Sequence, residues 1–283
     1  MKKILSALLF PVIFFGCAQK PLNVKPVKTL KPFHTPESVL ATPGGVYYVS
    51  NIGGFGVDGD GTISKVVNDS VTTFATGLND PKGLAFKDGI IYAADKNQIR
   101  KIDAQGNVSI FVDSTAFPSV PKFLNDLAFD NLGNLFVSET GTLDSSDGAV
   151  YKITPDGNVS TFIDYITTPE ISSPNGLLFD KENNLFIIDY NTGKLLKISA
   201  NGKELEVIDK SGKHGDGIAY DSQGFLYYSD WDGGKIFRVD QQNNSAVIDS
   251  GFTSPADITI DQEKDWLLIP EFNANDVKVV SLY

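Results

Sequence analysis

Six copies of one pattern run along the chain, and they constrain its fold more than any other feature. The copies begin at the segments PESVLA, PKGLAFKDG, LNDLAFDNLG, PNGLLFDKEN, GDGIAYDSQG and PADITIDQEK. Equivalent residues in these segments follow one another at intervals of 45, 43, 50, 41 and 40 residues. Each segment precedes further short runs rich in Val, Ile, Phe and Tyr, which are separated by Gly, Asn and Asp. Such runs are typical of β-strands joined by tight turns.

Repeats of this length with four strands each predict an all-β protein, a six-bladed β-propeller with four-stranded blades. The sixth copy stops at Tyr283 after its third strand. The segment KPVKTLKPFHTP before the first copy matches the segment that precedes the second copy, so we expect a strand around residues 27–30 to complete the last blade. This closure protects the strand edges at the join. Residues 27–283 are therefore expected to form a single domain.

The N-terminal segment MKKILSALLFPVIFFGCAQK has the features of an export signal. Two lysines precede a mostly apolar run over residues 4–15, which is too short to span a bilayer and suits a signal-peptide core. The run ends at Gly16-Cys17, which resembles a bacterial lipoprotein signal with Cys17 as the lipidated residue; an ordinary secretory signal is the alternative. We expect a signal peptide over 1–17, a polar tether over 18–26, and a protein exported to the bacterial cell envelope, at its periplasmic or outer surface. The lipid anchor would be the sole membrane contact.

The charge of the chain argues against a nucleic-acid-binding protein, and its cysteine content excludes a disulfide-stabilised fold. The chain has 35 acidic and 24 basic residues and a formal net charge of −11, so nucleic acid is not an expected partner. Cys17 is the sole cysteine, so no intramolecular disulfide can form. We expect a monomer that acts on a small molecule.

In a propeller, the innermost strands surround a central channel, so equivalent residues at their starts form a ring around one mouth. Turn chemistry accounts for Asn or Asp at such positions but accounts poorly for Glu. Two carboxylates and two amides on one axis would repel unless a cation or protons neutralised them. Their oxygens suit a hard cation, with Ca²⁺ preferred and Mg²⁺, Mn²⁺ or Zn²⁺ as alternatives. The predicted ring consists of Glu37, Lys82, Asn125, Asn175, Asp216 and Ala256.

The order of these motifs resembles a known family. Glu in the first copy, Asn-Asp in the third, PNG in the fourth and DG in the fifth are similar to the senescence marker protein/gluconolactonase family of regucalcin-like propellers, over residues 26–283. The resemblance implies a divalent metal at the channel mouth bound by Glu37, Asn175 and Asp216. It implies that Asn125 contacts the substrate or a water on the metal, and that the chain hydrolyses lactones.

One ring residue and two residues near the ring leave the identity of the substrate open. Sugar lactonases of this family commonly carry a basic residue where this chain has Phe123, which indicates a less polar substrate. Lys82 would either bind an anionic group of the substrate or be a solvated lysine at a strand end, and the second interpretation is favoured. His214 lies two residues before Asp216, as a rim residue that contacts substrate or as an ordinary loop histidine.

The chemistry implied is hydrolysis of a cyclic ester, with the metal polarising the carbonyl group and activating water. Asp216 is the favoured base, because its flanking glycines are expected to leave room for a substrate. The glycine-rich segment 51–62 is expected to be a long hairpin loop over the same face. Asp189 and Asp230 at the ends of second strands are expected to accept backbone hydrogen bonds. The competing hypothesis is a surface-tethered propeller that binds a protein or glycan without catalysis, and a strictosidine-synthase type of propeller ranks last.

Overall fold

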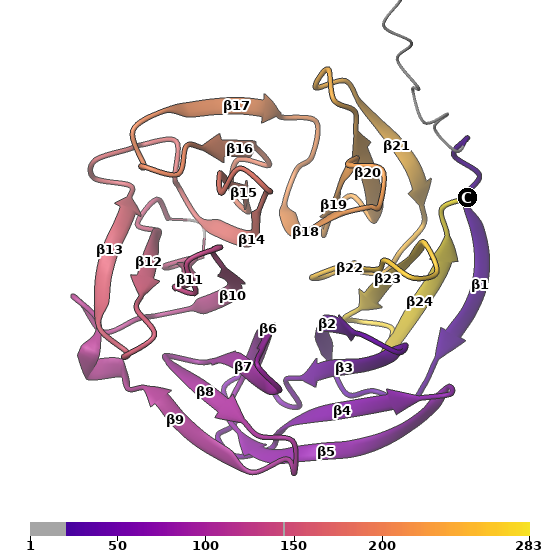
Figure 1. Ribbon diagram of the computed structural model, residues 1–283, viewed down its shortest axis with the longest axis horizontal. Helices are drawn as coiled ribbons and strands as arrows, with labels where there is room; N and C mark the ends of the chain where they lie inside the picture. Colours follow the sequence, from indigo (N-terminus) through magenta and orange to yellow (C-terminus); the bar gives the residue numbers. More distant parts are fainter. Residues whose placement is uncertain (1–20, 144) are drawn as a thin grey trace, which may run out of the picture.

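Six four-stranded antiparallel sheets surround a central axis in the computed structural model, which describes residues 21–143 and 145–283 (Figure 1). The predicted six-bladed β-propeller is therefore confirmed. The helical content of these residues is one 3₁₀ turn, Ser114–Ala116, and it is too short to cross a bilayer. The predicted signal peptide and Cys17 lie outside the described residues.

In each of the first three blades, the chain runs from the innermost strand to the outermost strand. Blade 1 contains β2 (Pro36–Thr42), β3 (Val46–Asn51), β4 (Gly61–Val67) and β5 (Ser70–Leu78). Blade 2 contains β6 (Pro81–Lys87), β7 (Ile90–Asp95), β8 (Gln98–Ile102) and β9 (Val108–Val112). Blade 3 contains β10 (Leu124–Phe129), β11 (Leu135–Glu139), β12 (Ala149–Ile153) and β13 (Val159–Asp164).

The last three blades continue in the same direction around the axis. Blade 4 contains β14 (Pro174–Phe179), β15 (Leu185–Asp189), β16 (Leu195–Ile198) and β17 (Leu205–Asp209). Blade 5 contains β18 (Gly215–Tyr220), β19 (Leu226–Asp230), β20 (Lys235–Val239) and β21 (Ser245–Ser250). Blade 6 contains β22 (Thr259–Asp261), β23 (Trp266–Glu271), β24 (Asp276–Ser281) and, from the other end of the chain, β1 (Lys25–Leu30).

The N-terminal strand closes the ring as expected. β1 pairs antiparallel with β24, with Thr29 opposite Lys278 and Leu30 opposite Val277. Leu30 is buried and packs in the cluster that joins blades 6 and 1. The strand begins at Lys25, so the last two residues of the predicted tether belong to it.

The hydrophobic core consists of six clusters, each shared between two neighbouring blades. One cluster, for example, joins Phe136 and Val150 of blade 3 to Leu177 and Ile187 of blade 4. Apolar side chains are therefore used between the blades, and the channel at the centre is left to the polar side chains of the inner strands.

A repeated polar contact fixes the start of each inner strand. The last residue of each second strand accepts a hydrogen bond from the backbone N–H of a residue that precedes the inner strand of the same blade, by one or two residues in blades 1 to 5 and by six in blade 6. Asp189, for example, accepts from Ser172 and Ser173 at 2.8 and 2.7 Å, and Asp230 accepts from His214 at 3.2 Å. The expected structural role of these two acids is confirmed. The six acceptors are Asn51, Asp95, Glu139, Asp189, Asp230 and Glu271.

Candidate active site at the channel mouth

The predicted ring residues occupy equivalent places in the fold. Five of them are the second residue of an inner strand, and all five are buried, with side chains between 2 and 5% exposed. The register between each of these inner strands and its second strand shifts at this point, for example between Pro36 and Val39 and between Gly215 and Ile218. Such a bulge removes residues from regular pairing and redirects their side chains. The five residues are Glu37, Lys82, Asn125, Asn175 and Asp216.

Blade 6 departs from this arrangement. Its inner strand β22 is regular over only three residues, and Ala256 lies before it, between the isolated bridges made by Pro255 and Asp257. Asp257 pairs in parallel with Ser38 of blade 1, so the two ends of the ring of blades also meet at the channel wall. The ring therefore has an apolar residue at its sixth position.

The glycines beside Asp216 have a different role from the one expected. A Cβ atom on Gly215 would lie 2.0 Å from Cγ1 of Ile188 in blade 4, and one on Gly217 would lie 2.7 Å from Oδ1 of Asp257 in blade 6. The glycines therefore let the neighbouring blades approach closely, and they do not leave room for a substrate. The space that the missing side chains leave is filled by protein.

A second set of acids lies one residue further along the chain, and no role was expected for it. Asp126 and Asp257 each follow a ring position, and each fits beside a glycine of an adjacent blade. The Oδ1 and Oδ2 atoms of Asp126 accept from the backbone of Leu127 and Leu177, both at 2.6 Å. Burial raises the pKa of Asp257 to about 7, although a hydrogen bond from Ser38 at 2.5 Å opposes the rise. The available signal was an acid directly after two of the six ring positions, Asn125 and Ala256.

Two buried carboxylate oxygens at the mouth have no hydrogen-bond partner. They are Oε2 of Glu37 and Oδ1 of Asp216. Burial first, and then the nearby charges of Asp216 and Asp257, raise the pKa of Glu37 well above its ordinary value, while Lys82 lowers it. Burial and Asp257 raise the pKa of Asp216, and a hydrogen bond with the Asn175 side chain lowers it. Buried carboxylates in this condition favour either a proton or a bound cation.

The donor set suits a hard cation. The unpartnered oxygens of Glu37 and Asp216 and the amide of Asn175 belong to blades 1, 5 and 4. Within residues 21–143 and 145–283, no three His, Cys, Asp or Glu side chains come together in an arrangement that could hold a metal ion. A cation here would therefore depend on the Asn175 amide oxygen and on water in addition to two carboxylates, which is the chemistry of Ca²⁺ or Mg²⁺ sites and differs from that of zinc sites.

Asn125 and Lys82 complete the ring on the side of blades 2 and 3. The side-chain nitrogen of Asn125 donates to the Thr140 hydroxyl at 3.1 Å, which fixes the orientation of its amide. The Lys82 side chain is 2% exposed, so the favoured expectation of a solvated lysine is wrong. Its ammonium donates to the carbonyl oxygen of Asp80 at 3.3 Å and lies 4.3 Å from the centroid of the Phe123 ring. Burial lowers the pKa of Lys82, and the nearby Glu37 charge opposes this effect.

His214 lies beside the ring and is not part of it. Its Nδ1 atom is 2.7 Å from Oδ2 of Asp232, and its ring stacks on Tyr190 with centroids 4.7 Å apart. A third of the side chain is exposed, so His214 belongs to the rim. Whether it contacts substrate stays a prediction.

The loop between β3 and β4 covers part of the same face, as expected for the glycine-rich segment. The backbone N–H of Gly56 donates to Asp80 of blade 2 at 2.8 Å, and Asp58 pairs with Lys96 of the same blade at 2.6 Å. Phe55 stacks on Phe123 of blade 3 with centroids 5.9 Å apart. The loop therefore extends from blade 1 over the entries of two other inner strands.

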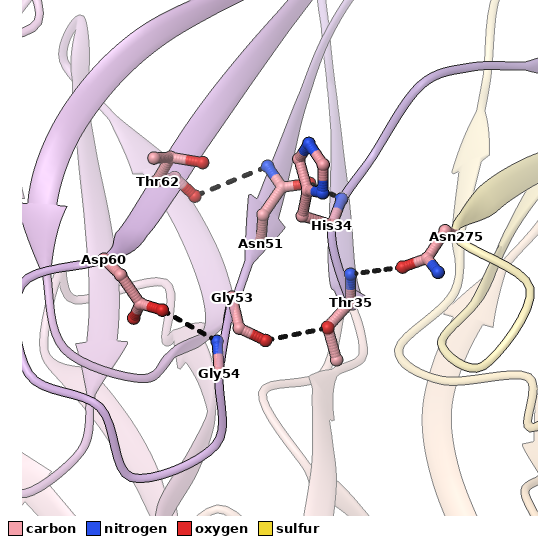
Figure 2. A pocket seen from close by; sticks show the side chains of 8 residues that line it. All are labelled: His34, Thr35, Asn51, Gly53, Gly54, Asp60, Thr62 and Asn275. Atoms are coloured by element: carbon pink, nitrogen blue, oxygen red, sulfur yellow. Dashed lines mark hydrogen bonds between the residues drawn. The ribbon is translucent and has the colours of Figure 1, made fainter.

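A polar cavity of about 430 Å³ lies where this loop meets blade 6 (Figure 2). Thr35 donates from its backbone N–H to Asn275 at 2.7 Å and from its hydroxyl to the carbonyl oxygen of Gly53 at 2.9 Å (Figure 2). Asp60 accepts from the N–H of Gly54 at 2.9 Å. These contacts join the loop to the segment just before Glu37, so they help to position this candidate residue of blade 1. The lining residues are His34, Thr35, Asn51, Gly53, Gly54, Asp60, Thr62 and Asn275.

Comparison with known proteins gives a family match over most of the chain. The model of the SMP-30/gluconolactonase/LRE-like region matches residues 45–269, a range that holds four of the five polar ring residues and begins after Glu37. None of the curated proteins compared with the chain matches it.

Solved structures share the fold at low sequence identity. The calcium-binding protein regucalcin from Agrobacterium tumefaciens str. C58 is 16% identical, with a TM-score of 0.70 over 91% of this chain and 94% of that one. A streptogramin B lyase is 13% identical, with a TM-score of 0.67 over 93% and 98%. Virginiamycin B lyase from Staphylococcus aureus is 14% identical, with a TM-score of 0.66 over 93% and 100%. At these identities the structures establish the propeller alone.

Proposed function

Because the chain belongs to the SMP-30/gluconolactonase/LRE-like family, we propose that it is a metal-dependent hydrolase that opens lactones at its channel mouth. The observation that carries the proposal is the pair of buried, unpartnered carboxylate oxygens of Glu37 and Asp216 beside the Asn175 amide. A propeller that binds only proteins or glycans would have no use for this costly arrangement inside its channel. The similarity in fold to a calcium-binding protein agrees with a cation at this site.

Glu37, Asn175 and Asp216 would hold the cation, with Ca²⁺ as the preferred ion. When bound, it would polarise the ester carbonyl and offset the negative charge that develops on the carbonyl oxygen. The three ligands come from blades 1, 4 and 5, so the closed ring of blades sets their spacing. Rigid strands are a favourable support for such a site.

The side chains of the ring would carry the proton and orient the substrate. Asp216 is the proposed base: its carboxylate removes a proton from the attacking water as oxygen adds to the carbonyl carbon. The ring ester bond then breaks, and the same proton passes to the departing alkoxide, which leaves a hydroxy acid that releases its carboxyl proton to the solvent. Asn125, oriented by Thr140, would contact the substrate, and the Lys82 ammonium would face its developing negative charge. The rim residue His214 would contact the part of the substrate that lies outside the ring.

We also propose that the protein acts in the bacterial cell envelope as a monomer, attached to the membrane through a lipid on Cys17. This part of the proposal rests on the N-terminal sequence. Replacing Cys17 with Ala should move the protein from the membrane fraction to the soluble fraction and remove the mass of the lipid. Retention of the variant in membranes would contradict the anchor.

The lactonase proposal is tested with protein stripped of metal by a chelator. Aliphatic, aromatic and sugar lactones are offered with and without Ca²⁺, Mg²⁺ or Mn²⁺, and Asp216→Asn is compared with the native chain. We expect metal to restore hydrolysis and to raise the thermal unfolding temperature, and the variant to lose both effects. The control is Asp249→Asn, which removes the same charge from the outermost strand of the same blade.

Three results would count against the proposal. Hydrolysis that does not depend on added metal would remove the role of the cation, and hydrolysis that survives Asp216→Asn would remove the proposed base. Metal-dependent stabilisation without turnover of any lactone would keep the cation site and reject the reaction.

A further inference from the structure

Four aromatic side chains from four different blades make a continuous line of ring contacts at the channel mouth. Phe123 precedes β10, Phe55 lies in the loop between β3 and β4, Phe272 follows β23, and Trp231 follows β19. The ring centroids are 5.9 Å apart for Phe123 and Phe55, 6.5 Å for Phe55 and Phe272, and 4.8 Å for Phe272 and Trp231. We call these four residues the aromatic belt.

The belt contacts the candidate site at its Phe123 and Phe55 end. Phe123 is two residues before the ring residue Asn125, and Trp231 directly follows the last residue of β19. The Lys82 ammonium lies 4.3 Å from the centroid of Phe123 and 5.7 Å from that of Phe55. A cation and the face of an aromatic ring attract each other, so Lys82 holds the Phe123 and Phe55 end of the belt in place.

The belt exposes apolar surface where a soluble protein has little reason to do so. Phe55 is 58% exposed, although it sits at the tip of a loop held by backbone hydrogen bonds and an ion pair. Phe123, Phe272 and Trp231 are only partly buried. Exposed apolar surface beside a polar, concave site is typical of ligand binding, in which the apolar part fixes the ligand and the polar part performs the chemistry.

We infer that the aromatic belt is a substrate subsite that selects lactones carrying a fused or attached aromatic ring over sugar lactones. The inference rests on the proposed lactonase function. The flat rings of the belt offer stacked and edge-to-face contacts to another aromatic ring. They offer one hydrogen-bond donor, the Trp231 indole N–H, so the hydroxyl groups of a sugar lactone would be desolvated there without partners.

Two lactones that share a six-membered ester ring test the subsite. They are 3,4-dihydrocoumarin, which carries a fused benzene ring, and δ-valerolactone, which does not. We expect Phe55→Ala and Phe272→Ala each to lower kcat/KM for dihydrocoumarin about tenfold through KM, and to change the value for δ-valerolactone less than about twofold. Each variant is compared with the native protein on the same substrate, so the different intrinsic reactivities of the two esters cancel.

Phe86→Ala is the matched control. Phe86 is 41% exposed and lies near the far end of β6, the strand that carries Lys82 near its start. The substitution Phe86→Ala therefore removes an exposed phenyl group away from the mouth. We expect it to leave kcat/KM for both lactones unchanged.

Measuring the binding of dihydrocoumarin distinguishes failure of the subsite proposal from failure of the lactonase proposal. If no lactone is hydrolysed, calorimetric titration with dihydrocoumarin still reports on the belt, and binding that Phe55→Ala weakens and Phe86→Ala does not would support it. If both lactones are hydrolysed and Phe55→Ala and Phe272→Ala affect them equally, or not at all, the subsite is rejected and the lactonase function stands. Tighter binding of gluconolactone than of dihydrocoumarin by the native protein would also reject the subsite.

Discussion

The Lys82 ammonium lies 4.3 Å from the centre of the Phe123 ring, in a channel mouth whose other polar ring residues are carboxylates and amides. The lysine comes from blade 2 and the phenylalanine from blade 3, and Phe55 from the blade 1 loop covers both. A buried positive charge thus lies beside the acids that would bind a cation. The Lys82 ammonium and a bound metal ion would compete for the same acids, because Lys82 lowers the pKa of Glu37 and would also repel the metal ion.

Replacing Lys82 with Met should therefore tighten cation binding. Removing a unit charge near the ligands is worth about 1 kcal/mol through partly screened space, so we expect the Kd for Ca²⁺ to fall about fivefold to tenfold. Calorimetric titration of the metal-free protein measures the change. Lys87→Met, at the other end of the same strand, removes the same charge and should leave the Kd unchanged. Weaker binding in Lys82→Met would show that the lysine supports the cation site.

The acids of the channel should make the metal-free protein less stable as the pH rises. The pKa values of Glu37, Asp126 and Asp216 are raised in the folded protein, and that of Asp257 is about 7 against an ordinary 3.8. A group with a raised folded-state pKa favours folding fully below its unfolded pKa, and that contribution is lost as the pH rises through the folded value. For Asp257 the loss falls between about pH 4 and pH 7 and amounts to a few kcal/mol, at about 1.4 kcal/mol for each pH unit.

Thermal unfolding from pH 5 to pH 8 tests this pH dependence. Without metal the Tm should fall with pH, and Asp257→Asn should reduce the slope because its amide cannot ionise. Added Ca²⁺ should flatten the curve, because the ion neutralises the carboxylates without protons. Asp249→Asn on the outer strand is the control and should keep the native slope. A Tm that rises with pH in the absence of metal would contradict the buried, protonated acids.

The repeat pattern predicted the propeller, its closure and the ring, because each depends on residues that recur at equivalent positions. Burial of Lys82 could not be predicted in this way, since Phe55 and Phe123 reach it from two other blades. The same limit applies to the glycines around Asp216, whose neighbours belong to blades 4 and 6. Local sequence identifies a residue that faces the channel, whereas contacts between blades decide how much solvent and charge surround it.

The recurring acceptors at the ends of second strands should contribute strongly to stability. Asp189 is fully buried and accepts hydrogen bonds from the backbone N–H groups of Ser172 and Ser173. In Asp189→Ala these two N–H groups would stay buried without an acceptor. We expect a loss of about 2 to 5 kcal/mol in the free energy of unfolding, measured in urea. Asp240→Ala removes an acid with similar contacts from an exposed turn and should cost less than about 1 kcal/mol. Equal losses in the two variants would contradict a special role for the buried acceptor.

The closure of the ring by the N-terminal strand predicts that Leu30 contributes to the stability of the whole domain. Leu30 is 2% exposed and packs with Phe33, Val277 and Val279, so it joins the two ends of the described chain. Leu30→Ala removes buried methyl groups from this join and should lower the free energy of unfolding by about 2 to 4 kcal/mol. Val27 lies in the same strand and is 39% exposed, so Val27→Ala should change stability by less than about 1 kcal/mol. Urea unfolding followed by fluorescence measures both values. If Leu30→Ala were as mild as Val27→Ala, β1 would be a peripheral strand, and the ring of blades would hold together without it.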